Sequence, residues 1–203
     1  MSKKEHWDKI YSTKTLQEVS WYQPVPKISL ELILSLKLSK ESPIIDVGGG
    51  DSFLVDSLIE KGYLDLTVLD ISKVAIERAK NRLGKHAKKV NWIISDITNF
   101  YPERKYSVWH DRAVFHFLRN EQEINSYLKS LNDGTDDNGK LVIGTFAENG
   151  PLRCCALDVM RYSFNDLENT FSNYFQINKM INSIHQTPFN TDQSFNFVQA
   201  IKK

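Results

Sequence analysis

The chain is poor in cysteine, with only Cys154 and Cys155, which are adjacent in sequence. Adjacent cysteines form a disulfide poorly because the ring that it would close is strained. No structural disulfide is therefore expected, and the absence of a signal peptide favours a reducing, cytoplasmic location. No group of cysteine and histidine residues has the spacing of a zinc site, so no metal site is predicted.

The chain also lacks long apolar runs and any strong excess of charge of one sign. No run approaches the roughly 18 apolar residues of a membrane-spanning helix, so no membrane partner is expected. Lys and Arg number 26 against 25 Asp and Glu, giving a net charge near +1. This balance gives no electrostatic reason to expect a nucleic acid as partner. The 203 residues suit one domain of ordinary size, and a single domain over 1–203 is predicted.

Glycine is scarce, with 9 residues, yet three of them stand together as Gly48-Gly49-Gly50. They follow a short apolar run that contains Asp46, and an amphipathic segment at 53–59 comes next. A second apolar run at 66–69 ends in Asp70. The order of strand, glycine turn, helix and strand with a terminal carboxylate is typical of a nucleoside-binding α/β protein. The glycines let the backbone approach a ligand, and the Asp70 carboxylate can accept hydrogen bonds from both ribose hydroxyls.

The glycine pattern indicates which nucleoside is bound. A dinucleotide site favours G-x-G-x-x-G, and here Gly48 and Gly50 fit the first two positions but Phe53 stands at the third. Asp46, at the mouth of the turn, would repel a pyrophosphate but can accept hydrogen bonds from an ammonium group. S-adenosylmethionine has a ribose, an adenine and an α-ammonium group, and it has no phosphate. The residues therefore favour S-adenosylmethionine over a dinucleotide.

The rest of the chain alternates between predicted strands and helices. The patterns predict helices over 73–83 and around 124–131, strands over 90–94, 106–109 and 141–146, and a polar loop over 132–139. Ser72 is expected to cap the first of these helices and Gly84 to end it. The leucines at 30–38 alternate as in a strand, but leucine favours helices, and a helix is predicted. Alternating strands and helices imply a parallel sheet with helices on both faces.

Four motifs in this order resemble the class I (seven-strand) S-adenosylmethionine-dependent methyltransferases. They are the D-x-G-x-G segment 46–50, Asp70 at the end of the second strand, Ile94-Ser95-Asp96-Ile97 after the third, and Val108-Trp109-His110-Asp111-Arg112 after the fourth. The early segments 7–11 and 20–22 are similar to those of a subgroup with protein-lysine methyltransferases and uncharacterised bacterial members. The resemblance implies a doubly wound, mostly parallel, seven-stranded Rossmann-like sheet with an antiparallel C-terminal edge. It also implies that residues 1–40 form an N-terminal helical arm, or lid, together with the first helix, and that residues 41–203 form the Rossmann-like core.

The resemblance further implies the residues that hold the cofactor at the carboxyl ends of the strands. Asp70 is predicted to bind the ribose, although it is also placed to cap the helix after Ser72. Asp96 with the Ile97 amide would bind the adenine amino edge, or Asp96 would cap a helix. Ile71 would pack on adenine or belong to the core. The predicted cofactor-binding residues are Asp46, Gly48, Gly50, Asp70, Ile71, Asp96, Ile97 and Tyr11.

The acceptor is predicted to lie beside the residues that follow the fourth strand. Asp111 is predicted to hold and deprotonate an amine, His116 to act as a base near neutral pH, and Arg112 to bind a substrate carboxylate. Lysine-modifying relatives have D-K-G-T-x-D here, and His116 replaces the second acid. His116 between two phenylalanines is alternatively a packed core residue. Trp21 and Tyr22 are predicted to touch the substrate as part of the lid, or else to anchor the arm by burial.

These observations predict an S-adenosylmethionine-dependent methyltransferase that acts on a nitrogen, oxygen or sulfur nucleophile and releases S-adenosylhomocysteine. A small-molecule acceptor is favoured because no extra domain or charged docking surface is visible. The alternative within the enzyme class is a protein-lysine methyltransferase. An alternative of another class is a module that binds S-adenosylmethionine without turnover.

Overall fold

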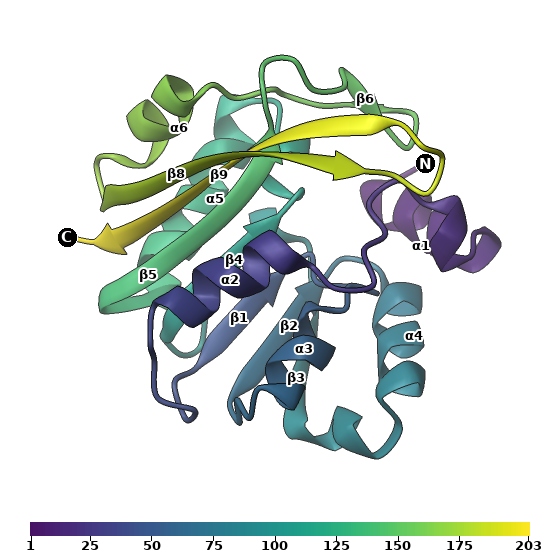
Figure 1. Cartoon of the computed structure of the whole chain (residues 1–203), viewed down its shortest axis with the longest axis horizontal. Helices are drawn as coiled ribbons and strands as arrows, with labels where there is room; N and C mark the ends of the chain where they lie inside the picture. The colour runs from purple at the N-terminus through teal and green to yellow at the C-terminus, as the bar shows by residue number, and fades with distance from the viewer.

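The structure is a computed structural model that describes all residues 1–203. A seven-stranded sheet with the order β3-β2-β1-β4-β5-β9-β8 crosses the molecule (Figure 1). Strands β1 to β5 are parallel, and β9 is antiparallel to both of its neighbours. The strands are β1 (Ile44–Val47), β2 (Leu66–Asp70), β3 (Val90–Ile94), β4 (Tyr106–Arg112), β5 (Thr135–Phe146), β8 (Phe175–Gln186) and β9 (Asp192–Lys202). The predicted doubly wound sheet with an antiparallel C-terminal edge is confirmed.

Helices cover both faces of this sheet because each buried strand directs apolar side chains alternately to one face and to the other. Ile44 packs with residues of α2 and α3, whereas its neighbour Ile45 packs in a separate cluster with residues of α5 and α6. The helices are α1 (Lys3–Thr13), α2 (Lys27–Ser35), α3 (Leu54–Glu60), α4 (Lys73–Leu83), α5 (Glu121–Gly134) and α6 (Phe164–Phe171). A small hairpin of β6 (Arg153–Cys154) and β7 (Leu157–Asp158) follows β5. None of the helices is long and apolar enough to cross a bilayer.

The local helix signals in the sequence act as predicted. The Ser72 hydroxyl accepts a hydrogen bond from the Ala75 amide at 3.2 Å, and α4 ends at Gly84, whose φ is +54°. The leucine-rich segment 30–38 is helical only as far as Ser35, in α2. Two short 3-10 turns, Gly84–Lys89 and Ile97–Asn99, flank β3, and two more span Leu16–Glu18 and Phe115–Phe117.

Two boundaries differ from the prediction. The expected polar loop over 132–139 is divided between α5, which continues to Gly134, and β5, which begins at Thr135. The register of β5 against β4 shifts there, so the polar residues form a bulge within a paired strand and not a free loop. The second difference is that His110, Asp111 and Arg112 lie inside β4 and not after it. Because side chains alternate across a strand, His110 and Arg112 face one side of the sheet and Asp111 the other.

The N-terminal arm lies against the start of α4 (Figure 1). The Asp8 carboxylate accepts hydrogen bonds from the Ser72 hydroxyl at 2.7 Å and from the Val74 amide at 3.3 Å. The Arg78 guanidinium donates to the carbonyl oxygens of Tyr11 and Lys14, both at 2.7 Å. These contacts hold α1 beside the carboxyl ends of β1 and β2.

Candidate active site

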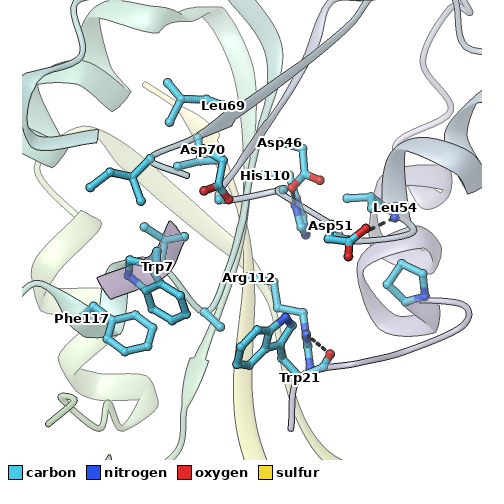
Figure 2. A pocket seen from close by; sticks show the side chains of 18 of the residues that line it. Trp7, Trp21, Asp46, Asp51, Leu54, Leu69, Asp70, His110, Arg112 and Phe117 are labelled. Atoms are coloured by element: carbon cyan, nitrogen blue, oxygen red, sulfur yellow. Dashed lines mark hydrogen bonds and ion pairs between the residues drawn. The ribbon is translucent and has the colours of Figure 1, made fainter. Parts of the chain in front are cut away.

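A pocket lies at the carboxyl ends of β1, β2 and β4 and is covered by the N-terminal arm. Figure 2 shows the carboxylates of this pocket gathered in one part and its aromatic side chains, with Arg112, in another. The first part is called here the acid rim, formed by Asp46, Asp51 and Asp70. The second part is called the acceptor side, formed by Trp21, Arg112, Phe146, Cys154 and Phe195.

The glycine turn after β1 brings its backbone close to two side chains that line the pocket. Gly48 has a φ of +67°, and a Cβ added there would lie 1.9 Å from Cγ2 of Val114. A Cβ added to Gly50 would lie 2.5 Å from Oδ2 of Asp70. Only glycine fits these positions, because a left-handed backbone and a close neighbour both exclude a side chain. Gly48 lines the pocket, whereas Gly50 leaves room for the Asp70 carboxylate without lining the pocket itself.

Asp46 is held by a chain of buried hydrogen bonds. Its Oδ1 is 2.6 Å from Nδ1 of His110, and Nε2 of the same imidazole is 2.8 Å from the hydroxyl of Ser29 in α2. The second oxygen, Oδ2 of Asp46, is buried and has no hydrogen-bond partner. A buried carboxylate oxygen without a partner is costly, and a ligand ammonium group would supply the missing donor.

Asp70 lies at the end of β2 and is only 5% exposed. Its Oδ1 accepts a hydrogen bond from the Ser72 amide at 2.7 Å. Burial, together with the negative charges of Asp46, Asp8 and Asp51, raises the pKa of Asp70 to about 7. The acid rim therefore favours a ligand that brings positive charge and hydrogen-bond donors.

Asp51 completes the acid rim and was not assigned a role from the sequence. Arg78 Nε lies 2.9 Å from its Oδ2, and Arg82 pairs with its Oδ1. Arg82 also holds Asp56 at 2.8 Å. Asp51 is thus a neutralised anchor between the glycine turn and α4. Asp51 could have been found from the sequence, because it is the acid that ends the segment 44–51. Nothing in the sequence indicated that Ser29 would support His110.

The predicted adenine contacts lie together in the pocket lining. Asp96, Ile97 and Ile71 all line it. Oδ1 of Asp96 also accepts hydrogen bonds from the amide and the hydroxyl of Thr98, at 2.9 and 2.8 Å. Asp96 therefore caps the turn Ile97–Asn99 and faces the pocket as well, so the two roles considered for it are compatible.

Aromatic residues of the arm close the pocket from above. The rings of Trp7 and Phe117 meet edge to face with centroids 5.2 Å apart, and Trp21 contacts Trp7 and Tyr11 in the same way at 5.8 and 5.9 Å. Tyr22 meets Phe53 at 5.9 Å. Tyr11, Trp21 and Tyr22 all line the pocket. These ring contacts form an aromatic cover over part of the pocket.

Arg112 is directed toward Trp21 on the acceptor side (Figure 2). Its Nη1 donates to the Trp21 carbonyl oxygen at 3.2 Å, and its guanidinium carbon lies 4.8 Å from the centre of the Phe195 ring. Nη2 is buried and has no partner. Burial lowers the pKa of Arg112 to about 10, so the side chain is still a cation at neutral pH.

The structure does not support the catalytic roles predicted for Asp111 and His116, since neither residue lines the pocket. Asp111 faces α5, where its Oδ2 accepts from the Tyr127 hydroxyl at 2.8 Å and its Oδ1 accepts from the Val114 amide at 2.9 Å. Burial raises the pKa of Asp111 to about 6. The prediction placed Asp111 after the strand, whereas alternation within β4 turns it away from the site.

His116 is fully buried and stacks on Phe146 with ring centroids 4.4 Å apart. Its Nδ1 accepts the Phe146 amide hydrogen at 3.2 Å. Burial, helped by the nearby positive charge of Arg112, lowers the pKa of His116 to about 3. A neutral, stacked imidazole that already accepts a backbone hydrogen bond matches the alternative of a packed core residue.

The strand order, the glycine turn and the acid at the end of β2 define a Rossmann-like, nucleoside-binding α/β protein of the methyltransferase type. A family model described as "Methyltransferase domain" matches residues 45–141. In sequence and fold the chain is similar to the class I, seven-strand S-adenosylmethionine-dependent methyltransferases, and the family model covers a little under half of it. The comparisons support the predicted family, whose cofactor is S-adenosylmethionine.

Individual relatives cover the chain in part. A malonyl-[acyl-carrier protein] O-methyltransferase 1 from Ilyobacter polytropus is 31% identical over 110 residues, which is 53% of this chain and 39% of the relative. An EEF1A lysine methyltransferase 2 from Danio rerio is 25% identical over 69% of this chain and 66% of its own length. The chain spans only 17–39% of the length of the first curated relatives that it matches.

A solved structure from work on the conversion of a disulfide bond into a thioacetal group during echinomycin biosynthesis superposes with a TM-score of 0.78. It covers 98% of this chain and 93% of the solved chain at 16% sequence identity. At this identity the similarity establishes the fold.

The residues of the pocket fit S-adenosylmethionine on the evidence of their own geometry. The partnerless Oδ2 of Asp46 suits the α-ammonium group, and the glycine turn leaves space where a Cβ would clash. Asp70 offers a carboxylate to ribose hydroxyls, and the absence of a free cation on the acid rim disfavours a pyrophosphate, since Arg78 and Arg82 are already paired there.

Proposed function

We propose that this protein transfers a methyl group from S-adenosylmethionine to a nitrogen, oxygen or sulfur nucleophile of a small molecule. The observation that carries the proposal is the acid rim, with the partnerless Oδ2 of Asp46 and the buried carboxyl of Asp70 at adjacent strand ends. In this proposal Asp46 binds the ammonium group, Asp70 the ribose, and Asp96 with Ile71 and Ile97 the adenine.

S-adenosylmethionine supplies a methyl group that is already activated by its positively charged sulfur. The protein then has to align the acceptor and exclude water, since direct displacement needs little further chemistry. The lid aromatics Tyr11, Trp21 and Tyr22 exclude water, and the turn at Gly48 brings the backbone next to the site.

The shape and charge of the acceptor side favour a small molecule over a protein lysine. Its walls are mainly aromatic, and its charged residue is the cation Arg112, which would repel a lysine ammonium group. The acid that the lysine-modifying pattern places in this region, Asp111, is turned toward α5. The similarity to a relative named EEF1A lysine methyltransferase 2 keeps the protein-lysine alternative open to test. The single domain over 1–203 and the cytoplasmic location both stay predictions.

Calorimetry with S-adenosylhomocysteine tests the cofactor part of this proposal. We expect micromolar binding, weakened by about 1.5–3 kcal/mol in Asp70→Ala, which is the scale of lost hydrogen bonds to a charged group. No binding by the unaltered protein would refute the proposal.

Incubation with methyl-labelled S-adenosylmethionine and a cell lysate, followed by separation by size, tests the acceptor class. We expect label in the small-molecule fraction. Label in protein alone would support the lysine alternative, and binding of the cofactor with no label transferred to any acceptor would support a module without turnover.

A further inference from the structure

The acceptor side holds a cation that makes no ion pair. Two side chains with a permanent positive charge line the pocket, Lys3 and Arg112. Lys3 pairs with Glu123 outside the site. Arg112 makes no ion pair, and the one protein oxygen that accepts from its guanidinium is the Trp21 carbonyl. A buried positive charge with one neutral acceptor is poorly compensated.

A purely structural role does not account for this arrangement. Where arginine supports the fold beside this pocket, it is fully paired: Arg78 reaches Asp51 and two carbonyl oxygens, and Arg82 reaches Asp51 and Asp56. Arg112 instead keeps Nη2 buried and without a partner at the wall of the cavity. An unused, desolvated donor of a guanidinium is the group that binds a carboxylate most strongly.

The histidines near Arg112 do not compensate or add to its charge. His185 donates from Nε2 to the Ser20 carbonyl at 2.7 Å, and its Nδ1 lies 3.1 Å from the Gln23 amide nitrogen. Burial and the charge of Arg112 lower the pKa of His185, as they do for His116. Both imidazoles are therefore neutral at pH 7. Arg112 is then the single cation of the acceptor side, and the negative charge of Asp46 acts on it without forming an ion pair.

The contacts of Arg112 place it on the acceptor side, although Asp46 of the acid rim is near enough for its charge to raise the pKa of Arg112. Its contacts are with Trp21 of the arm and Phe195 of β9, on the acceptor side of the pocket. The acid rim lies on the turn after β1 and at the end of β2. The free donor of Arg112 thus faces the space that the acceptor would fill beneath the lid.

We infer that the acceptor is a small carboxylic acid with an apolar body, bound with its carboxylate on Nη2 of Arg112 and its body against Phe146, Phe195 and Trp21. This inference rests on the proposed function and goes further by naming the chemical class of the substrate. A monoanion is the matching charge, because a phosphate dianion would need a second free cation. The aromatic walls suit a hydrocarbon or aromatic body.

Binding of matched acids and amides tests the inference without knowledge of the natural acceptor. The probes are benzoate, phenylacetate and 3-phenylpropionate, each compared with its own primary amide, which has the same shape and no charge. Titrations follow tryptophan fluorescence, since Trp7 and Trp21 line the pocket, with calorimetry as a second readout. Each titration is run with and without saturating S-adenosylhomocysteine.

We expect at least one acid to bind about tenfold more tightly than its amide, and Arg112→Gln to remove that preference. Arg112→Lys, which keeps the charge, should retain part of it. Arg161→Gln is the matched control, because Arg161 also lacks an ion pair but does not line the pocket. This control should leave the preference unchanged, and Arg112→Gln should change S-adenosylhomocysteine affinity by less than about threefold.

Two results would overturn the inference. One is an unaltered protein that never prefers an acid to its amide, a result that needs no variant to fold. The other is an Arg112→Gln protein that loses S-adenosylhomocysteine affinity as strongly as Asp70→Ala does, which would assign Arg112 to the cofactor's own carboxylate. Failure of the proposed function looks different: S-adenosylhomocysteine then does not bind, while the acid preference measured without it still decides the role of Arg112.

Discussion

Replacing Asp70 by asparagine should stabilise the free protein while it weakens cofactor binding. Asp70 is 5% exposed, and burial together with the surrounding acids raises its pKa to about 7 from a usual value of 3.8. Asparagine has the same shape and keeps an oxygen that accepts the Ser72 amide hydrogen, now 2.7 Å from Oδ1. The substitution removes only the cost of holding a negative charge in this place.

The size of the gain depends on pH. Because the folded state binds the Asp70 proton more tightly than the unfolded state, the carboxyl costs little stability below its unfolded pKa of 3.8. The cost grows as the pH rises toward 7 and is constant above it. A pKa of about 7 in place of 3.8 corresponds to about 4 kcal/mol. The advantage of Asp70→Asn in the free energy of unfolding should therefore rise from under about 1 kcal/mol near pH 4 to as much as about 4 kcal/mol at pH 8.

Urea denaturation of both proteins at pH 4, 6 and 8 measures this difference directly. Asp133→Asn is a suitable control because Asp133 lies at the surface in an ion pair with Lys129. Calorimetry at pH 8 should show S-adenosylhomocysteine affinity lowered by about 10- to 100-fold in Asp70→Asn. In the unaltered protein the affinity should fall as the pH drops below 7, because a protonated carboxyl accepts fewer hydrogen bonds. An unfolding advantage that does not change between pH 4 and pH 8 would refute the burial argument.

Three further outcomes are expected. Gly48→Ala should destabilise the fold by about 1–3 kcal/mol and reduce S-adenosylhomocysteine binding, since its Cβ would meet Val114. Gly62→Ala, at a φ of +85° but with open space around it, should keep binding. Equal loss of binding in both variants would show that backbone strain, and not the contact with Val114, decides. His116→Ala should lower the free energy of unfolding by about 2–4 kcal/mol, because it leaves a cavity and leaves the Phe146 amide without an acceptor. The affinity for S-adenosylhomocysteine should stay within about threefold. A stable variant that loses only turnover would restore the catalytic role of His116. Ser29→Ala should weaken S-adenosylhomocysteine binding by about 3- to 10-fold through loss of the hydrogen bond that orients His110 and Asp46, and unchanged affinity would mean that Asp46 keeps its position without this support.

The acid rim gives the site a consistent electrostatic character. Asp46, Asp51 and Asp70 meet at the ends of β1 and β2, and Asp8 of the arm adds a fourth negative charge beside them. Asp51 pairs with Arg78 and Arg82, and Asp8 pairs with Lys4, whereas Asp46 and Asp70 pair with no lysine or arginine. In the free protein this crowding is unfavourable, and a ligand that carries an ammonium group and a sulfonium would relieve it. Stability lost at a binding site for this reason is recovered when the ligand binds.

The sequence by itself determined the sheet, the glycine turn and the acid at the end of each inner strand. These features follow from local rules: Ser72 and Gly84 bound α4, and glycine alone tolerates the backbone at Gly48. The strand ends lie at one edge of the sheet because parallel strands joined by helices share a direction. The positions of Asp46, Asp70 and Asp96 could therefore be predicted without coordinates.

Only the tertiary structure decided the side of the pocket that receives the acceptor. Strand β4 is three residues longer than predicted, which leaves the fold unchanged. Because side chains alternate along a strand, Asp111 then faces Tyr127 while Arg112 lines the cavity. Ser29 reaches His110 because α2 packs against β4 and β5, a contact between residues 81 positions apart. Such contacts arise from packing between distant segments, and the sequence pattern of either segment alone does not specify them.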